Sequence, residues 1–270
     1  MKRFPFWSWL WFVMGALYFL LPLYGTLDFS LRAERGTLSL LAYERALSDP
    51  QFIRSFSFST QMAVYTIIVG FLLIVPTAYW VHLRLPRLRP VIEFVTLLPF
   101  VIPAIVLVFG LIRTFGRSLT IGALTIPPLT NTVMGSNFLL VAGYVVLAMP
   151  YLYRAVDNGL RAMDVRTLTE AALSLGASWP TILARVIFPN LRAALLSGAL
   201  LTFAIVIGEL TIANFLARPA FAPYLAVLSN SRAYEPAALS IVSFALTWAA
   251  MVLIDLVTRG RQSVVGAAGH

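Results

Sequence analysis

Long apolar runs separated by short polar segments dominate the hydrophobic pattern of this chain. A transmembrane helix needs about 20 mostly apolar residues to cross the hydrocarbon core of a bilayer. Six runs come close to this length or exceed it, and each is predicted to span the membrane: 6–27, 59–83, 91–112, 137–153, 191–217 and 236–258. We therefore expect an all-α, polytopic protein forming a single domain over residues 1–270, with its core at 59–258.

The first run, residues 6–27, could be mistaken for a cleavable signal peptide. It is longer than the apolar region of a usual signal peptide, it is rich in aromatic residues, and no A-x-A-like cleavage site follows it. It is predicted to be a retained helix.

Proline residues interrupt several of the predicted spans. Each removes a backbone N–H donor and should kink its helix, and neighbouring helices can satisfy the freed carbonyl within a membrane. Such kinks are either ordinary features of the helices or points where helices flex around a pathway. The residues are Pro76, Pro99, Pro103 and Pro150.

The basic residues between the spans predict the orientation of the chain. With the N-terminus in the cytoplasm, 12 Lys and Arg residues fall on the cytoplasmic side and 8 on the other side. Cytoplasmic loops carry the excess of Lys and Arg in most membrane proteins. Both termini are therefore predicted to be cytoplasmic, and the short loop 84–90 is the clearest anchor.

The composition agrees with a membrane protein and excludes several kinds of chemistry. The chain is 60% hydrophobic and 11% charged, whereas soluble domains carry about 25% charged residues. It has no cysteine, its two histidines are His82 and His270, and its single lysine is Lys2. A phosphate-binding P-loop requires a lysine after its glycines, so any ATP chemistry must lie on another chain. The net charge of +9 is spread between the spans and forms no single basic face, which argues against nucleic acid binding.

Residues 164–189 are predicted to form two short amphipathic helices joined at a glycine. Asp164 is a plausible N-cap of the first helix. Gly176 suits the left-handed position that ends this helix. The expected apolar face has helical spacing and comprises Leu168, Ala171, Ala172 and Leu175.

The second short helix is predicted to start with a Ser178 cap, to tolerate Pro180 in its first turn, and to end at Pro189. Its expected apolar stripe comprises Trp179, Ile182, Leu183, Val186 and Ile187. Periodicity alone allows two interpretations, an amphipathic hairpin lying on lipid or a hairpin that binds a protein.

This segment resembles the EAA loop of ABC importer permeases, the binding-protein-dependent inner-membrane components. That pattern is E-A-A, three residues, G, nine residues, I-x-L-P. The chain has Glu170-Ala171-Ala172, Gly176 and then Val186-Ile187-Phe188-Pro189 at the same spacing, with two apolar exchanges. The similarity extends over about 60–260, and the overall pattern is most similar to spermidine/putrescine-type permeases.

The resemblance implies a type I importer permease of a bacterial or archaeal inner membrane, with no cofactor of its own and no catalytic role. The implied partners are a second permease, identical or homologous, two ABC ATPase subunits that bind ATP and Mg²⁺, and a periplasmic or lipid-anchored solute-binding protein. It also implies that the loop 154–190 couples to the ATPase through the second short helix. The residues assigned to coupling are Glu170, Ala171, Ala172, Gly176, Ala177, Trp179, Ile182, Arg185 and Pro189.

Glu209 is the candidate for the substrate path, because it lies within the fifth predicted span. A carboxylate inside a span is costly and faces the protein interior or water. One interpretation is that it lines the path together with Asn214, and the other is a structural hydrogen bond.

The sequence also bears on three other functions. A self-contained secondary transporter usually shows internal repeats with paired broken helices, and no convincing repeat is seen. An intramembrane enzyme needs a nucleophile and base or a metal pair, for which the sequence offers no candidate set. A scaffold or sensor that binds the ATPase without moving solute can be separated only by a transport assay.

Overall fold

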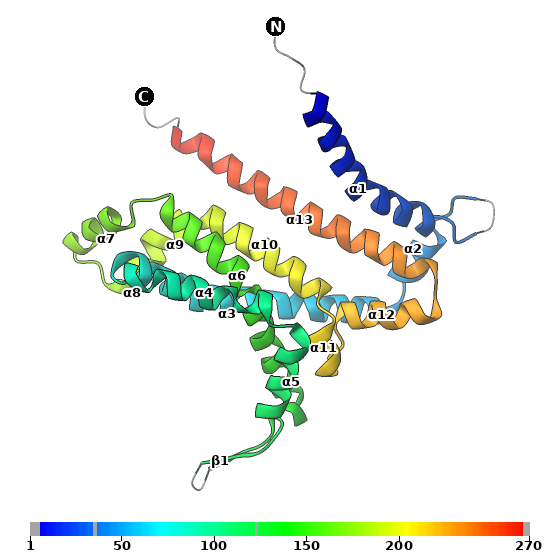
Figure 1. The fold of residues 1–270 in the computed structure, drawn as a ribbon, viewed down its shortest axis with the longest axis horizontal. Helices are drawn as coiled ribbons and strands as arrows, with labels where there is room; N and C mark the ends of the chain where they lie inside the picture. The colour runs from blue at the N-terminus through cyan, green and yellow to red at the C-terminus, as the bar shows by residue number, and fades with distance from the viewer. Residues whose placement is uncertain (1–5, 35–36, 122–123, 267–270) are drawn as a thin grey trace. The chain divides into compact units, whose positions relative to one another are not determined.

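The computed structural model describes residues 6–34, 37–121 and 124–266. Helices form almost all of it, which confirms the predicted helical fold class, and the exception is one short hairpin of two antiparallel strands (Figure 1). The elements in chain order are α1 (Phe6–Ser30), α2 (Leu41–Leu47), α3 (Pro50–Leu83), η1 (Pro86–Leu88), α4 (Arg89–Val101), α5 (Ala104–Phe115), β1 (Leu119–Ile121), β2 (Leu124–Ile126), η2 (Leu129–Asn131), α6 (Val133–Arg161), α7 (Val165–Ser174), α8 (Trp179–Thr181), the π-helical η3 (Ile182–Ile187), α9 (Phe188–Asn190), α10 (Arg192–Gly208), α11 (Thr211–Phe215), α12 (Phe221–Ser231) and α13 (Tyr234–Gly266).

Three helices within the described residues are long and apolar enough to cross a membrane, namely α1, α3 and α6. Two bent helix pairs raise this number to five if each pair counts as one span. The six separate spans predicted from the sequence are thus only partly seen.

The third predicted span, 91–112, is broken into α4 and α5, which meet at an angle of 98°. Ile102 is extended, with φ −86° and ψ 115°, and it precedes Pro103. A residue before proline disfavours the helical conformation, so the chain turns there. By contrast, Pro76 and Pro150 lie inside α3 and α6 without ending them.

The second predicted span starts nine residues earlier than expected, because α3 begins at Pro50. The Asp49 carboxylate accepts a hydrogen bond from the Gln51 backbone N–H at 2.9 Å, and proline is favoured in the first turn. The 34 residues of α3 correspond to about 51 Å of helix.

The chain divides into two compact units. Unit 1 comprises residues 1–54 and 224–249, and unit 2 comprises 55–223 and 250–270. In unit 1, Phe29 stacks on Tyr234 with ring centroids 4.8 Å apart. The Tyr224 hydroxyl donates to Asp49 at 3.0 Å.

Unit 2 has two apolar clusters, and α6 contributes to both. The helices α6 and α10 run side by side. A Cβ placed on Gly159 of α6 would lie 2.7 Å from the Ala194 Cβ and 2.7 Å from Leu191 Cδ2. Small residues therefore let the two backbones approach closely, as membrane helices commonly do.

The helix α3 contacts distant parts of unit 2 at two points. Near its start, the buried Ser59 hydroxyl accepts a hydrogen bond from the Phe221 backbone N–H at 2.8 Å. Near its end, Tyr79 is fully buried among residues of α6, α7 and η3.

Candidate functional site

The loop after α6 forms the predicted helix–Gly–helix hairpin, which we call the coupling hairpin (residues 164–190) after the role predicted for it (Figure 1). Asp164 caps α7 as predicted, since its carboxylate accepts a hydrogen bond from the Thr167 backbone N–H at 3.1 Å. A second bond from the Thr167 hydroxyl holds the pKa of Asp164 below its ordinary value. The left-handed conformation predicted for Gly176 is confirmed, with φ +76°.

The apolar face of α7 differs from the predicted one by a rotation about the helix axis. Val165, Thr169 and Ala172 are buried, whereas Ala171 is exposed and Leu175 is 88% exposed. The helix ends at Ser174, so Leu175 no longer follows the helical spacing and its side chain leaves the core-facing side. Of the Glu-Ala-Ala sequence, only Ala172 faces the core.

The second short helix ends one residue after Pro189, close to the predicted end. It runs from Trp179 to Asn190, and the chain then bends by 78° into α10. The π-helical turn η3 (Ile182–Ile187) lies within this helix and ends two residues before Pro189.

Ser178 precedes this helix as predicted, but its hydroxyl does not cap a backbone N–H. It bonds instead to the Thr181 hydroxyl at 2.9 Å.

The predicted apolar stripe of the second helix exists, but it faces the core of unit 2. Ile182 and Ile187 are fully buried, and Leu183 and Val186 pack against the same cluster. Ala177 is partly buried there too. The stripe is therefore not available to insert into a groove of a partner, which corrects the expected role of Ile182.

Trp179 also contacts its own chain. Its ring lies 4.9 Å from the Trp80 ring of α3 and 6.5 Å from that of Tyr79. The Arg84 guanidinium lies over both tryptophan rings, 5.3 Å from each centroid. Trp179 therefore fastens the hairpin to α3 and is not a free anchor for a partner.

A buried hydrogen bond joins the other helix of the hairpin to α3. The Tyr79 and Thr169 hydroxyls lie 2.8 Å apart, and the Thr169 hydroxyl also donates to the Val165 carbonyl at 2.7 Å. Both halves of the hairpin are thus attached to one helix. This attachment was not predicted, because nothing in the apolar run 59–83 marks which aromatic residues contact the loop.

The outward face of the hairpin carries the remaining predicted residues. Glu170 forms an exposed ion pair with Arg166 at 2.8 Å, and Arg185 is exposed. Leu175 adds an apolar side chain beside the Gly176 turn.

Glu209 lies at a break in the predicted fifth span, between α10 and α11. Its carboxylate is 9% exposed and accepts hydrogen bonds from the backbone N–H of Ile212 at 2.9 Å and of Ala213 at 3.2 Å. It therefore caps α11, and this contact supports the structural interpretation. Asn214 is exposed on α11.

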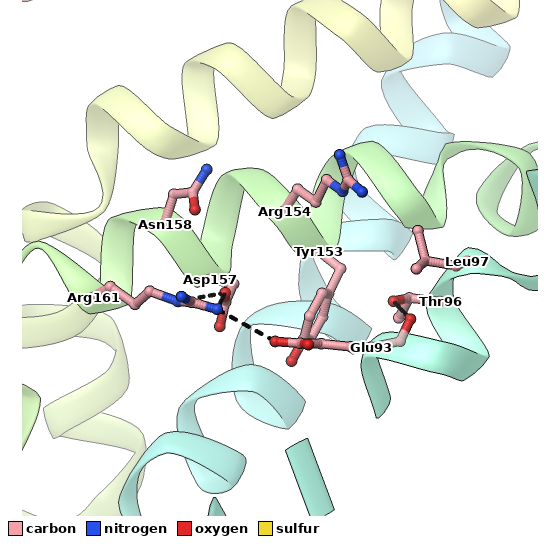
Figure 2. Close-up of a pocket in the computed structure, with 8 residues that line it drawn as sticks. All are labelled: Glu93, Thr96, Leu97, Tyr153, Arg154, Asp157, Asn158 and Arg161. Carbon is pink, nitrogen blue, oxygen red and sulfur yellow. Dashed lines mark hydrogen bonds and ion pairs between the residues drawn. The ribbon is translucent and has the colours of Figure 1, made fainter. Parts of the chain in front are cut away.

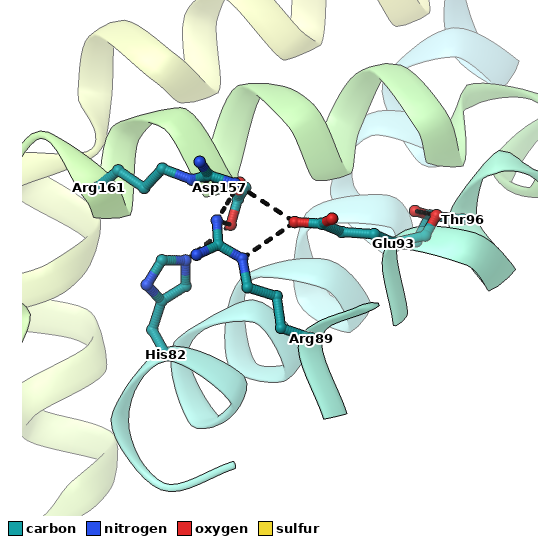
Figure 3. A network of polar contacts seen from close by, with 6 residues as sticks. All are labelled: His82, Arg89, Glu93, Thr96, Asp157 and Arg161. Carbon is teal, nitrogen blue, oxygen red and sulfur yellow. Dashed lines mark hydrogen bonds and ion pairs between the residues drawn. The ribbon is translucent and has the colours of Figure 1, made fainter. Parts of the chain in front are cut away.

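A buried carboxylate that is not among the predicted site residues lies near the end of α6 (Figure 3). Asp157 accepts hydrogen bonds from His82 Nε2 at 2.7 Å, from Arg89 at 2.9 Å and from Arg161 at 2.8 Å. Both arginines also pair with Glu93. A buried charge requires such partners.

The predicted span ended at residue 153, which left Asp157 in a loop. The helix continues to Arg161 because Val156 and Leu160 keep the apolar spacing.

These features define a multi-span membrane protein with a helix–Gly–helix loop, and known proteins share this fold. A structure of a bacterial ABC transporter that imports the acidic polysaccharide alginate matches with a TM-score of 0.66. The match covers 95% of this chain and 96% of that chain at 14% sequence identity.

Residues 74–262 match the family described as the binding-protein-dependent transport system inner membrane component. The chain belongs to this family of ABC transporter permeases, which are not themselves enzymes.

Individual relatives have different printed substrates. A probable molybdenum ABC transporter permease of Haloferax volcanii is 36% identical over 135 residues, which is 50% of this chain and 48% of that protein. The spermidine/putrescine permease PotC of Haemophilus influenzae is 31% identical over 44% of this chain and 48% of its own length. The chain thus spans about half the length of these two relatives. A probable sulfate permease of Prototheca wickerhamii is 31% identical over 70% of this chain and 71% of its own length.

Proposed function

We propose that this chain is a translocation subunit of an ABC importer. It pairs with a second permease, receives solute from a binding protein, and is driven by two ATPase subunits that bind and hydrolyse the ATP. The observation that carries this proposal is the coupling hairpin, in which a left-handed Gly176 follows Glu-Ala-Ala within a family member. In this arrangement the hairpin and both termini face the cytoplasm.

The exposed face of the hairpin is the proposed contact with the ATPase. Leu175 offers the apolar anchor, and Glu170 and Arg185 offer charged contacts around it. A few residues buried at the centre of an interface commonly supply most of its binding energy, while exposed charges contribute little.

The face of the hairpin that packs against unit 2 transmits the movement of the ATPase subunits to the transmembrane helices. Trp179 and Thr169 fix the two helices of the hairpin to α3, so a displacement of the hairpin must also move that transmembrane helix. Ala172, Ile182 and Ile187 belong to the apolar cluster that packs between the hairpin and α3. This division explains why one hairpin needs both a buried stripe and an exposed apolar tip.

The proposed cargo is a small hydrophilic solute. A polyamine-like substrate follows from the sequence resemblance and from PotC. An oxyanion is an equal candidate, because relatives are named for molybdenum and sulfate. Glu209 and Asn214 remain candidates for the path, with the capping of α11 as the first role of Glu209.

The experiment compares Leu175→Ser with the matched control Leu38→Ser. Leu38 is 70% exposed and lies in the segment between α1 and α2, which the proposed topology puts on the opposite side of the membrane. The assembled complex in proteoliposomes is assayed for ATPase co-purification and for ATP-dependent uptake of a polyamine and of molybdate.

We expect Leu175→Ser to lower co-purification and uptake at least fivefold and Leu38→Ser to change neither. Wild-type behaviour of Leu175→Ser would refute the docking surface. Uptake that persists without any ATPase subunit would instead indicate a self-contained transporter.

A further inference from the structure

A polar pocket of about 290 Å³ opens between α4 and α6, at the end of α6 that leads into the coupling hairpin (Figure 2). None of the residues assigned to coupling or to the substrate path lines it. The lining residues are Glu93, Thr96, Leu97, Tyr153, Arg154, Asp157, Asn158 and Arg161.

The charges around this pocket leave an excess of positive charge. Asp157 and Glu93 are already paired with Arg89 and Arg161, as Figure 3 shows. Arg154 adds a third guanidinium, and it forms no ion pair with any residue that the structure describes. With Arg89, which pairs with both carboxylates but does not line the pocket, three guanidinium groups accompany two carboxylates, and the unpaired Arg154 is exposed at the pocket.

A buried donor in the same pocket also lacks a partner. Tyr153 is 3% exposed, and its hydroxyl forms no hydrogen bond within the described part of the chain. Buried polar groups are nearly always paired with protein, water or ligand. An oxygen-rich ligand would accept from this hydroxyl, from the Arg154 guanidinium and from the Asn158 amide, which also lines the pocket.

The position of the pocket indicates where such a ligand comes from. Five charged or titratable side chains gather where α3, α4 and α6 come together. Charged side chains are costly at the centre of a bilayer, so we place this level of the protein at the headgroup region. Basic pockets between transmembrane helices at this level suit the phosphate of anionic lipids.

We propose that the pocket between α4 and α6 binds a phosphate-class oxyanion, either the headgroup phosphate of an anionic phospholipid or free phosphate. Arg154 supplies the charge-assisted hydrogen bonds and Tyr153 donates from the buried wall. Arg89 and Arg161 keep the two carboxylates neutralised, so they do not repel the ligand. This site is independent of ATP coupling and of the transported solute.

The test uses the purified full chain in detergent and measures binding of short-chain phosphatidylglycerol, short-chain phosphatidylcholine and inorganic phosphate by native mass spectrometry. We expect phosphatidylglycerol to bind at least tenfold more tightly than phosphatidylcholine. Arg154→Gln should weaken this binding about tenfold, because a charge-assisted contact is lost, and Tyr153→Phe about threefold. The matched control is Arg87→Gln, which removes the same charge from an exposed residue of η1 outside the pocket.

The outcomes separate the two sources of phosphate. Competition by inorganic phosphate supports a free anion, and phosphatidylglycerol binding without such competition supports a lipid headgroup. Equal binding of both lipids with no phosphate binding would overturn the proposal, and so would equal losses in Arg154→Gln and Arg87→Gln. Tyr153→Phe keeps the ring in the core, so it decides the question if Arg154→Gln does not fold.

Discussion

The hydrogen bond between Tyr79 and Thr169 gives a quantitative test of how firmly the hairpin is attached to α3. The Thr169 hydroxyl uses its only proton to donate to the Val165 carbonyl, so its oxygen must accept from the Tyr79 hydroxyl at 2.8 Å. The two partners are therefore not equivalent. Removing the donor and removing the acceptor should have different costs.

Tyr79→Phe removes the donor and leaves one lone pair of Thr169 unfilled. The loss of one neutral hydrogen bond costs about 1 kcal/mol. Thr169→Val keeps the shape of the side chain but leaves a fully buried Tyr79 hydroxyl without an acceptor, which costs about 2 kcal/mol. The double variant removes both groups, so its cost should fall about 1 kcal/mol below the sum of the single variants.

Reversible unfolding in mixed micelles measures the three free energies of unfolding, and ATP hydrolysis per solute transported measures coupling in the same variants. We expect Thr169→Val to be the less stable single variant and the one that hydrolyses more ATP per solute. Equal losses in the single variants would refute the assigned direction of the bond, and strictly additive losses would show that the two hydroxyls do not interact. Unchanged coupling despite the loss in stability would show that this attachment does not transmit movement.

Three further predictions concern other parts of the chain. Gly176→Val should lower the free energy of unfolding by about 1–2 kcal/mol from left-handed strain alone, since no atom lies within 4 Å of a Cβ there. It should also uncouple ATP hydrolysis from uptake. Gly176→Asn, which tolerates this conformation, should retain coupling in the same assay. Glu209→Gln should keep one accepted hydrogen bond and allow the complex to assemble, while uptake changes. Glu209→Ala should lose the cap of α11 and about 1 kcal/mol of stability. Uptake kinetics identical to wild type in Glu209→Gln would show that the carboxylate does not contribute to the substrate path. Gly266→Cys introduces the only cysteine in the chain and should react with a membrane-impermeant maleimide only from the cytoplasmic side, so labelling from outside would invert the proposed topology.

The sequence predicted local features whose cause is local. Asp164 caps α7 and Gly176 takes a left-handed turn because each depends on the residue itself and its neighbours along the chain. The helical periodicity of the second short helix was equally visible. Periodicity, however, cannot tell which partner an apolar stripe meets, and Ile182 and Ile187 turned out to face the core of the same chain.

The errors arise where distant segments meet or where a helix changes its geometry. The pairing of Asp157 with His82 and Arg89 joins residues at least 68 positions apart, so no local sequence pattern predicts it. The second short helix contains the π turn η3, where ordinary helical spacing was predicted. Pro103 indicated a break near Ile102 in the sequence. The sequence could not show that Pro76 and Pro150 would leave their helices unbroken.

The two attachment points of α3 make this helix a lever. Ser59 and Tyr79 are 20 residues apart, which places about 30 Å of helix between the hydrogen bond to Phe221 and the bond to Thr169. A tilt of about 10° at the hairpin end would displace the other end by about 5 Å if the helix stays rigid. A small tilt at the hairpin end would then reach the far end of α3 as a displacement of this size, carried by the helix itself.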